Sequence, residues 1–173
     1  MSFTLYLMRH AKSDWSGSGS SDFERPINER GKRSALIIGQ WLLDNEHIPQ
    51  HIVSSSAVRA KQTTELATSI ISPEIISYEK ELYLASVETL LHLIQTYKTG
   101  LNSLMVVAHN PGLEELVEYL IVKSEQSGSG ITSMTTANMA IFEYSDNQFD
   151  IKNDKGRLIE FIRPSVAVEN KAN

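Results

Sequence analysis

The stretch Leu5-Tyr6-Leu7-Met8-Arg9-His10-Ala11-Lys12-Ser13 decides the fold. Its apolar run ends abruptly at an arginine and a histidine, followed by a small residue, a lysine and a hydroxyl. Apolar runs of this length favour a buried strand, and open α/β folds bind their ligands beyond the carboxyl ends of such strands. Guanidinium and imidazole groups at that edge favour an oxyanion. The alternative is a surface strand end with two incidental polar residues.

A second stretch has the same design. Ile52-Val53-Ser54-Ser55 predicts another buried strand, and the helix after it runs to about Ile71, with Ser55 or Ser56 as its cap. Arg59 then falls in the first turn, where the helix dipole makes a cation unfavourable by about 0.3–1 kcal/mol. A bound anion would offset that cost, because helix N-termini also attract anions. The alternative is an exposed arginine on a solvated helix face.

A third stretch, Leu104-Met105-Val106-Val107-Ala108-His109-Asn110-Pro111-Gly112, is again a continuous apolar run that ends in a histidine. Such runs are typical of parallel strands buried on both faces. The three predicted strands therefore deliver Arg9, His10, Arg59 and His109 to one edge of a sheet. Two arginines can hold a tetraoxyanion by bidentate hydrogen bonds. One histidine can attack phosphorus, and the second can stabilise the phosphoryl oxygens.

The remaining pattern completes an α/β chain. Helices are predicted from Asn28 to about Asn45, from Ser86 to Tyr97 and from Pro111 to Val122, with strands at 74–77, 139–144 and 157–162. Strands that alternate with helices favour parallel pairing through right-handed crossovers, whereas the last two strands form a hairpin. We therefore expect a single-domain three-layer α/β/α sandwich with a mostly parallel mixed sheet.

Composition narrows the function. The chain has 173 residues, of which 41% are hydrophobic and 21% charged, and its net charge of -5 argues against nucleic acid as a partner. Cysteine is absent, which excludes disulfides and thiolate chemistry. No apolar run approaches the ~20 residues of a membrane span, so we expect a cytoplasmic protein without a membrane partner. The Gly-Ser segments at 16–21 and 127–130 are predicted loops that lack the lysine of a phosphate-binding P-loop.

Together these motifs resemble the histidine phosphatase (phosphoglycerate mutase-like) superfamily, and the small phosphohistidine phosphatases of the SixA type in particular. The resemblance runs from about residue 3 to residue 144. It is carried by Arg9-His10-Ala11-Lys12-Ser13, Arg25-Pro26, Glu29-Arg30-Gly31, the pattern Ser-Ser-x-x-x-Arg-Ala-x-Gln-Thr at 54–63, and Ala108-His109-Asn110-Pro111-Gly112.

The resemblance implies a phosphoglycerate mutase-like fold. We expect a histidine phosphatase domain over residues 1–164 and a flexible tail over 165–173, because chain termini after a proline tend to fray. The resemblance also implies that His10 is the phosphorylated nucleophile. Arg9, Arg59 and His109 would complete the phosphate pocket, with Asn110 as a further donor. No cofactor and no metal is implied. A metal would be repelled by Arg9 beside His10, and nothing completes its ligand shell.

The chain departs from the family pattern at the acid. Mutases and many phosphomonoesterases of the superfamily carry a glutamate that protonates a leaving alkoxide, and Glu79 and Glu81 lie in that region. Glu81 is a weak candidate for this general acid, its alternative being a solvated loop charge. An imidazole, with a pKa of about 6.5, leaves without such an acid. The other histidines, His47, His51 and His92, match no motif and are interpreted as surface or packing residues.

We therefore expect a metal-independent phosphatase that acts through a phosphohistidine intermediate, with phosphohistidine on a protein as its substrate. A phosphatase of small phosphate esters is the alternative enzyme. A phosphate-binding module without turnover is the alternative from another class. The sequence leaves the physiological substrate and the oligomeric state open.

Overall fold

The computed structural model describes residues 1–17, 21–124 and 133–169. One sheet of six strands runs through the molecule in the order β3-β2-β4-β1-β5-β6. Its strands are β1 (Phe3–Arg9), β2 (His51–Ser55), β3 (Ile75–Glu79), β4 (Ser103–Ala108), β5 (Met139–Tyr144) and β6 (Arg157–Ile162). The first four strands are parallel, whereas β5 and β6 are antiparallel to their neighbours. The mixed sheet predicted from the sequence is confirmed.

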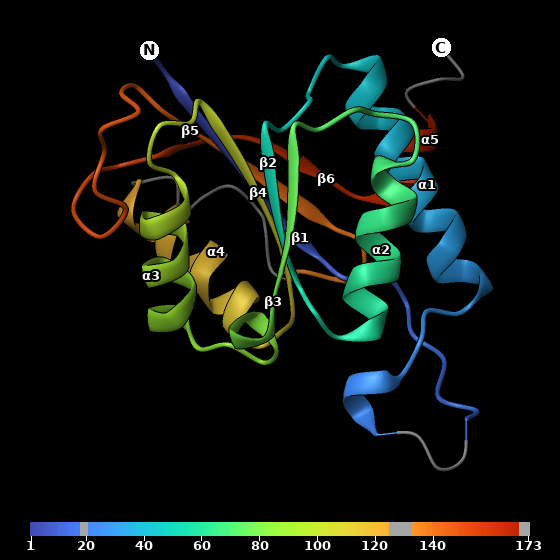
Figure 1. Cartoon of the computed structure of the whole chain (residues 1–173). Coiled ribbons are helices and arrows are strands. Elements are labelled where there is room, and N and C mark those ends of the chain that lie inside the picture. The colour runs from blue at the N-terminus through green and yellow to red at the C-terminus, as the bar shows by residue number, and fades with distance from the viewer. Residues whose placement is uncertain (18–20, 125–132, 170–173) are drawn as a thin grey trace.

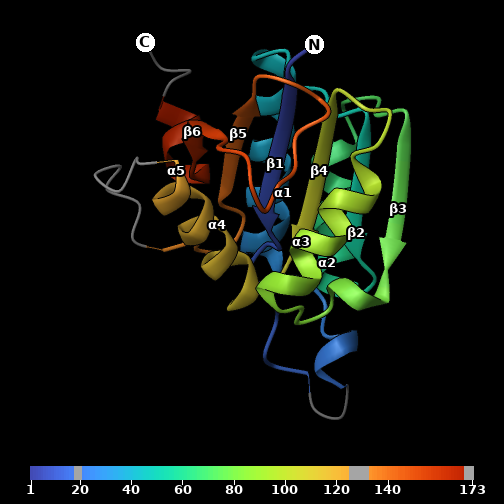
Figure 2. The same ribbon diagram turned by 90° about the vertical axis from the view of Figure 1, so that its left-hand side faces the viewer.

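Helices cover both faces of the sheet (Figures 1 and 2). One face carries α1 (Glu29–Asp44), α2 (Val58–Thr68) and α5 (Pro164–Glu169), and the other carries α3 (Val87–Tyr97) and α4 (Gly112–Lys123). Two short 3-10 helices, η1 (Asp22–Glu24) and η2 (Lys80–Leu82), complete the described elements. The molecule is therefore the predicted three-layer α/β/α sandwich.

The alternating side chains of β1 supply both halves of the core. Leu5 and Leu7 pack into the cluster under α3 and α4, whereas Tyr6 and Met8 pack into the cluster under α1 and α2. This central strand lies between β4 and β5 and is buried on both faces. A strand in that position has little freedom to shift, because each core cluster fixes alternate residues. Arg9, which ends β1, is consequently held firmly at the sheet edge.

The structure confirms the N-cap predicted for α1 and corrects the one predicted for α2. Asn28 caps α1, since its side-chain oxygen accepts a hydrogen bond from the Gly31 N–H, as expected. The expected cap of α2 by Ser55 or Ser56 is wrong: Ala57 occupies that position and makes no side-chain cap bond. The Ser55 hydroxyl instead accepts from the Ala57 N–H and contacts His109. The helix also ends at Thr68, short of the predicted Ile71.

The end of the described chain corrects another expectation. Residues 165–169 were expected to belong to a flexible tail, but they form most of α5, which packs against α1. Ala167 is buried there in the cluster that also contains Trp41. The Gly-Ser segments predicted as loops are only partly covered by the structure. Residues 18–20 of the first segment and the whole of 127–130 lie outside the described residues. No helix within the described ranges could span a membrane.

Candidate active site

Three parallel strands end at the same edge of the sheet, and the predicted residues meet there. Arg9, His10, Arg59, His109 and Asn110 all line one pocket with a volume of about 310 Å³. The imidazole centroids of His10 and His109 are 4.9 Å apart. One phosphoryl group can therefore contact both rings. Glu81, the candidate acid, is exposed in η2 and is not among the residues that line the pocket.

The hydrogen bonds of His10 fix which nitrogen faces the pocket. Its Nδ1 lies 2.8 Å from the Ala11 carbonyl oxygen, which can only accept, so Nδ1 carries the proton. Its Nε2 accepts from the Arg59 Nε–H at 3.3 Å. Burial, assisted by the neighbouring arginines, lowers the pKa of His10 to about 4. At neutral pH the ring is uncharged, and the lone pair of Nε2 is the reactive position.

His109 is arranged as a donor. The Ser55 hydroxyl accepts from the Ala57 N–H, and its oxygen lies 2.7 Å from His109 Nε2. We assign the hydroxyl proton to that contact, which leaves the proton of the neutral imidazole on Nδ1. Burial and the nearby His10 lower the pKa of His109 to about 3, so the ring is neutral. His109 Nδ1 is buried and has no hydrogen-bond partner among the described residues, as expected of a group that meets a ligand.

The two arginines are fixed from different sides. Arg9 donates through Nη1 to the Met134 carbonyl at 2.9 Å, while its buried Nε has no partner among the described residues. Arg59 is only 2% exposed and reaches Asp22 with Nη2 at 3.0 Å. The cation in the first turn of α2 is therefore neutralised by a carboxylate from η1. The ion pair with Asp22 offsets the unfavourable interaction of Arg59 with the helix dipole that the sequence predicts.

Asn110 lines the pocket, but its donor group is already used. Its Nδ2 donates to the Met134 carbonyl at 3.0 Å and to Glu114 at 3.4 Å. The amide atom without a partner in the described chain is Oδ1, which is an acceptor. In this arrangement Asn110 positions the residue-134 backbone and does not offer an N–H to an anion.

The other histidines lie away from the pocket lining. His47 contacts Tyr6 and stacks on Trp41, whereas His51 contacts Ser77. His92 is exposed on α3. Within the described ranges, no three His, Asp or Glu side chains are grouped so as to hold a metal ion.

Sequence reasoning missed several lining residues. They include Lys12, Ser13, Trp15, Asp22, Arg25 and Leu84. Lys12 and Ser13 were signalled by their place directly after His10, and Arg25 by the Arg-Pro motif. Asp22 lies three residues before Arg25, in a segment that looked like a flexible loop by composition. Four cations and one carboxylate line the pocket, so an anion is favoured there although the chain is acidic overall.

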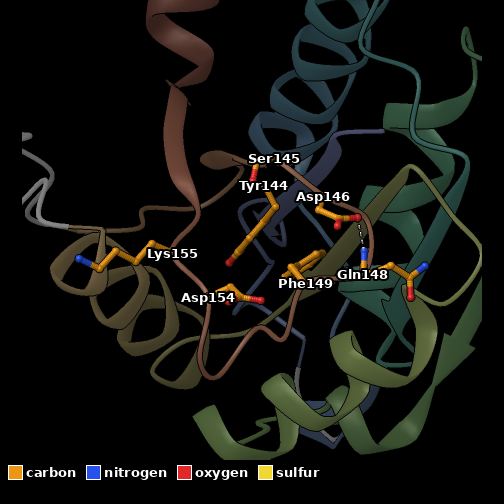
Figure 3. A pocket seen from close by; sticks show the side chains of 7 residues that line it. All are labelled: Tyr144, Ser145, Asp146, Gln148, Phe149, Asp154 and Lys155. Atoms are coloured by element: carbon orange, nitrogen blue, oxygen red, sulfur yellow. Dashed lines mark hydrogen bonds between the residues drawn. The ribbon is translucent and has the colours of Figure 1, made fainter.

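A second cavity, of about 350 Å³, has a different character (Figure 3). It lies beside Tyr144, which pairs with Phe3 at the start of β1. The cavity is therefore at the opposite end of that strand from His10. Asp146 and Asp154 line it together with a single lysine, and no imidazole is present in its lining. This composition does not suit a phosphoryl group, and the pocket around His10 remains the candidate active site.

Comparisons with known proteins agree with this site. A sequence profile of the histidine phosphatase superfamily (branch 1) matches residues 5–83. An uncharacterised protein of Mycobacterium tuberculosis is 30% identical over 164 residues, covering 91% of this chain and 99% of the relative.

Two solved structures extend the comparison. A candidate phosphohistidine phosphatase SixA from Agrobacterium tumefaciens is 33% identical, with a TM-score of 0.81 and coverage of 94% of this chain and 98% of the other. The protein histidine phosphatase SixA complexed with tungstate shares the fold, at 22% identity, a TM-score of 0.76 and coverage of 95% and 99%. With the matched profile and relatives of this length and identity, the chain belongs to the histidine phosphatase superfamily.

Proposed function

We propose that this chain is a metal-independent phosphatase that works through a covalent phosphohistidine at His10, with phosphohistidine on a protein as its substrate. One observation carries the proposal: the neutral His10 presents Nε2, with Nδ1 held by a carbonyl, into a pocket shared with Arg9, Arg59 and His109. The phosphorus of the substrate would be attacked by the Nε2 lone pair.

The surrounding groups suit the transition state of that step. Phosphoryl transfer spreads charge over three equatorial oxygens, so catalysis depends on positioning and on charge stabilisation. Arg9 and Arg59 supply fixed positive charge, and the Nδ1–H of His109 supplies a neutral donor without a competing partner in the described chain. These side chains provide the compensation that a metal ion supplies in other phosphoryl-transfer sites.

The lack of a protonated acid among the described residues of the pocket favours a phosphoramidate as the substrate. Hydrogen bonds from Tyr83 and Arg25 hold the pKa of Asp22, the carboxylate in the pocket lining, well below its usual range. In the free protein that carboxylate has no proton to give to a leaving alkoxide. An imidazole departs without such help, particularly when it is itself protonated. The 33% identity to a candidate phosphohistidine phosphatase supports the same substrate class.

A labelling experiment tests the proposal. Rapid quench of the wild type with ³²P-labelled phosphoimidazole, in the presence of EDTA, should trap an acid-labile, base-stable phosphoenzyme. His10→Ala should neither turn over nor become labelled, and it should still bind inorganic phosphate because both arginines remain. Normal turnover by His10→Ala would contradict the covalent mechanism, and activity that needs an added divalent ion would contradict metal independence.

A substrate comparison tests the finer claim. The initial rate on a protein carrying phosphohistidine should exceed the rates on a panel of alkyl phosphates. A wild type that prefers alkyl phosphates would instead favour a phosphatase of small esters, and binding without turnover on any substrate would favour a phosphate-binding module.

A further inference from the structure

Asp22 is the one carboxylate among the described residues that line the pocket. Three side chains hold it. Tyr83 donates to its Oδ2 at 2.6 Å, Arg59 donates to the same oxygen at 3.0 Å, and Arg25 donates to Oδ1 at 2.6 Å. Arg59 also donates to the Asp22 backbone carbonyl at 2.5 Å. In the first step proposed above, the attack of His10 on phosphorus, the Asp22 carboxylate neither gives nor takes a proton.

The carboxylate lies on the outer side of the pocket. Figure 1 shows η1 standing beyond the ends of the parallel strands, apart from the sheet. His10 is 7% exposed at the end of β1, whereas the side chain of Asp22 is 44% exposed. The Arg59 guanidinium lies between them, with Nε toward His10 and Nη2 toward Asp22. Water that attacks a phosphoryl group on Nε2 must approach in line, from the side of phosphorus away from Nε2. Asp22 is the solvent-exposed carboxylate of the pocket lining, and it lies beyond Arg59 as seen from His10.

Binding of the phosphoryl group changes the charge that the carboxylate feels. Tyr83, Arg25 and Arg59 favour the ionised form of Asp22 in the free protein. A phosphoryl group on His10 competes for the Arg59 donors and adds negative charge close to the carboxylate. Both effects raise the proton affinity of Asp22. The carboxylate therefore becomes a better proton acceptor at the stage when a water molecule must be activated.

We propose that Asp22 is the general base that hydrolyses phosphorylated His10, an inference that rests on the proposed function. Its carboxylate takes one proton from the attacking water. The water oxygen forms a bond to phosphorus, the P–Nε2 bond breaks, and its electron pair returns to Nε2. The products are inorganic phosphate, neutral His10 and a protonated Asp22 that releases its proton to solvent.

The two half-reactions separate this role from a structural one. In Asp22→Asn, which keeps the size and one oxygen of the side chain, ³²P-phosphoimidazole should label His10 at the wild-type rate. Loss of the labelled phosphoenzyme should slow by about 10²–10⁴-fold, the range of general base catalysis, so that label accumulates. If Asp22 only orients Arg59, both steps slow together and no label accumulates, which would overturn the inference. Wild-type loss of label would overturn it as well.

Two further variants sharpen the test. Glu24→Gln changes an exposed carboxylate in the same 3-10 helix that does not line the pocket, and it should behave as the wild type. Tyr83→Phe removes a hydrogen bond that lowers the pKa of Asp22, so the acidic limb of the dephosphorylation rate should move to higher pH. An unmoved limb would contradict the inference. A wild type that never becomes labelled would overturn the proposed function, and this inference with it.

Discussion

At the scale of residues, the two pocket histidines are set apart by their hydrogen bonds rather than by their type. Both rings are neutral because burial lowers their pKa values, to about 4 for His10 and about 3 for His109. The carbonyl partner of His10 leaves the lone pair on Nε2. We assign the Ser55 hydroxyl proton to the contact with His109 Nε2, and with that assignment His109 Nδ1 is a donor. His10 can therefore attack phosphorus and His109 can stabilise the phosphoryl oxygens, although both rings are in the same neutral state.

The residue pattern predicted four of these side chains but not Asp22. Arg9, His10 and His109 stand at or beside strand ends, and Arg59 in the first turn of a helix, so local sequence is enough to place them. The position of Asp22 depends on η1 folding back over Arg59, a tertiary contact between segments 37 residues apart. A stretch rich in glycine and serine carries no periodicity from which that contact could be inferred.

Titration of His10 gives a prediction at this scale. Its pKa of about 4 lies below the value of about 6.5 in an unfolded chain, so the unfolded chain binds more protons between these pH values. Proton binding at His10 in the unfolded chain therefore lowers folding stability as the pH falls from about 6.5 to about 4, and it has no effect on stability above that range. NMR of the labelled imidazole should show a neutral ring protonated at Nδ1 with a midpoint near pH 4. Inorganic phosphate should raise that midpoint, whereas a midpoint near 6.5 in the free protein would contradict the buried neutral state.

At the scale of elements, the site depends on how closely α1 approaches the chain after β1. A Cβ atom on Gly31 would lie 2.2 Å from the Lys12 carbonyl oxygen, which is backbone and cannot rotate away. The same carbonyl accepts from the Asn28 N–H at 2.9 Å, and Lys12 itself lines the pocket. The first turn of α1 therefore packs directly on the backbone that shapes the phosphate site.

Gly31→Ala should consequently damage both stability and binding. Overpacking of this kind costs about 1–3 kcal/mol, more than the helix propensity that alanine gains. Urea unfolding should show the loss of free energy, and calorimetry should show weaker binding of inorganic phosphate as Lys12 is displaced. Arg33→Ala, an exposed change in the same helix, is the matched control and should stay within about 0.5 kcal/mol of the wild type. Equal stability and equal affinity in Gly31→Ala would refute this account of the contact.

The elements also show where sequence reasoning ends. The central strands β1 and β4 were predictable because each is an apolar run bounded by polar residues. The cap of α2 was not, since a serine before a helix can bond either to the helix N–H groups or to another side chain. Ser55 contacts His109, so a tertiary hydrogen bond takes the place of the expected local one. The active site thus uses a residue that local rules would assign to the helix.

At the scale of the whole molecule, the site lies at one end of the sheet and the described C-terminus lies away from it. Both views show α5 well above η1 (Figures 1 and 2), and α5 packs against α1 without contributing a residue to the pocket lining. The boundary expected at residue 164 rested on Pro164 and on the tendency of chain termini to fray. The structure adds a packed helix there because Ala167 covers the cluster around Trp41, a contact that local composition does not reveal.

Two truncations test whether α5 is part of the folded unit. A chain ending at Pro164 loses the buried Ala167 and uncovers part of the core under α1, whereas a chain ending at Glu169 keeps the helix. Loss of the small contact should cost about 1 kcal/mol, and hence lower the Tm by about 2–4 °C relative to the chain ending at Glu169. Turnover of phosphoimidazole at 25 °C should be the same for both, because no residue of α5 lines the pocket. Equal Tm values would show that α5 adds nothing to the stability of the fold. If the shorter chain stays folded but loses turnover, the helix supports the active site from a distance.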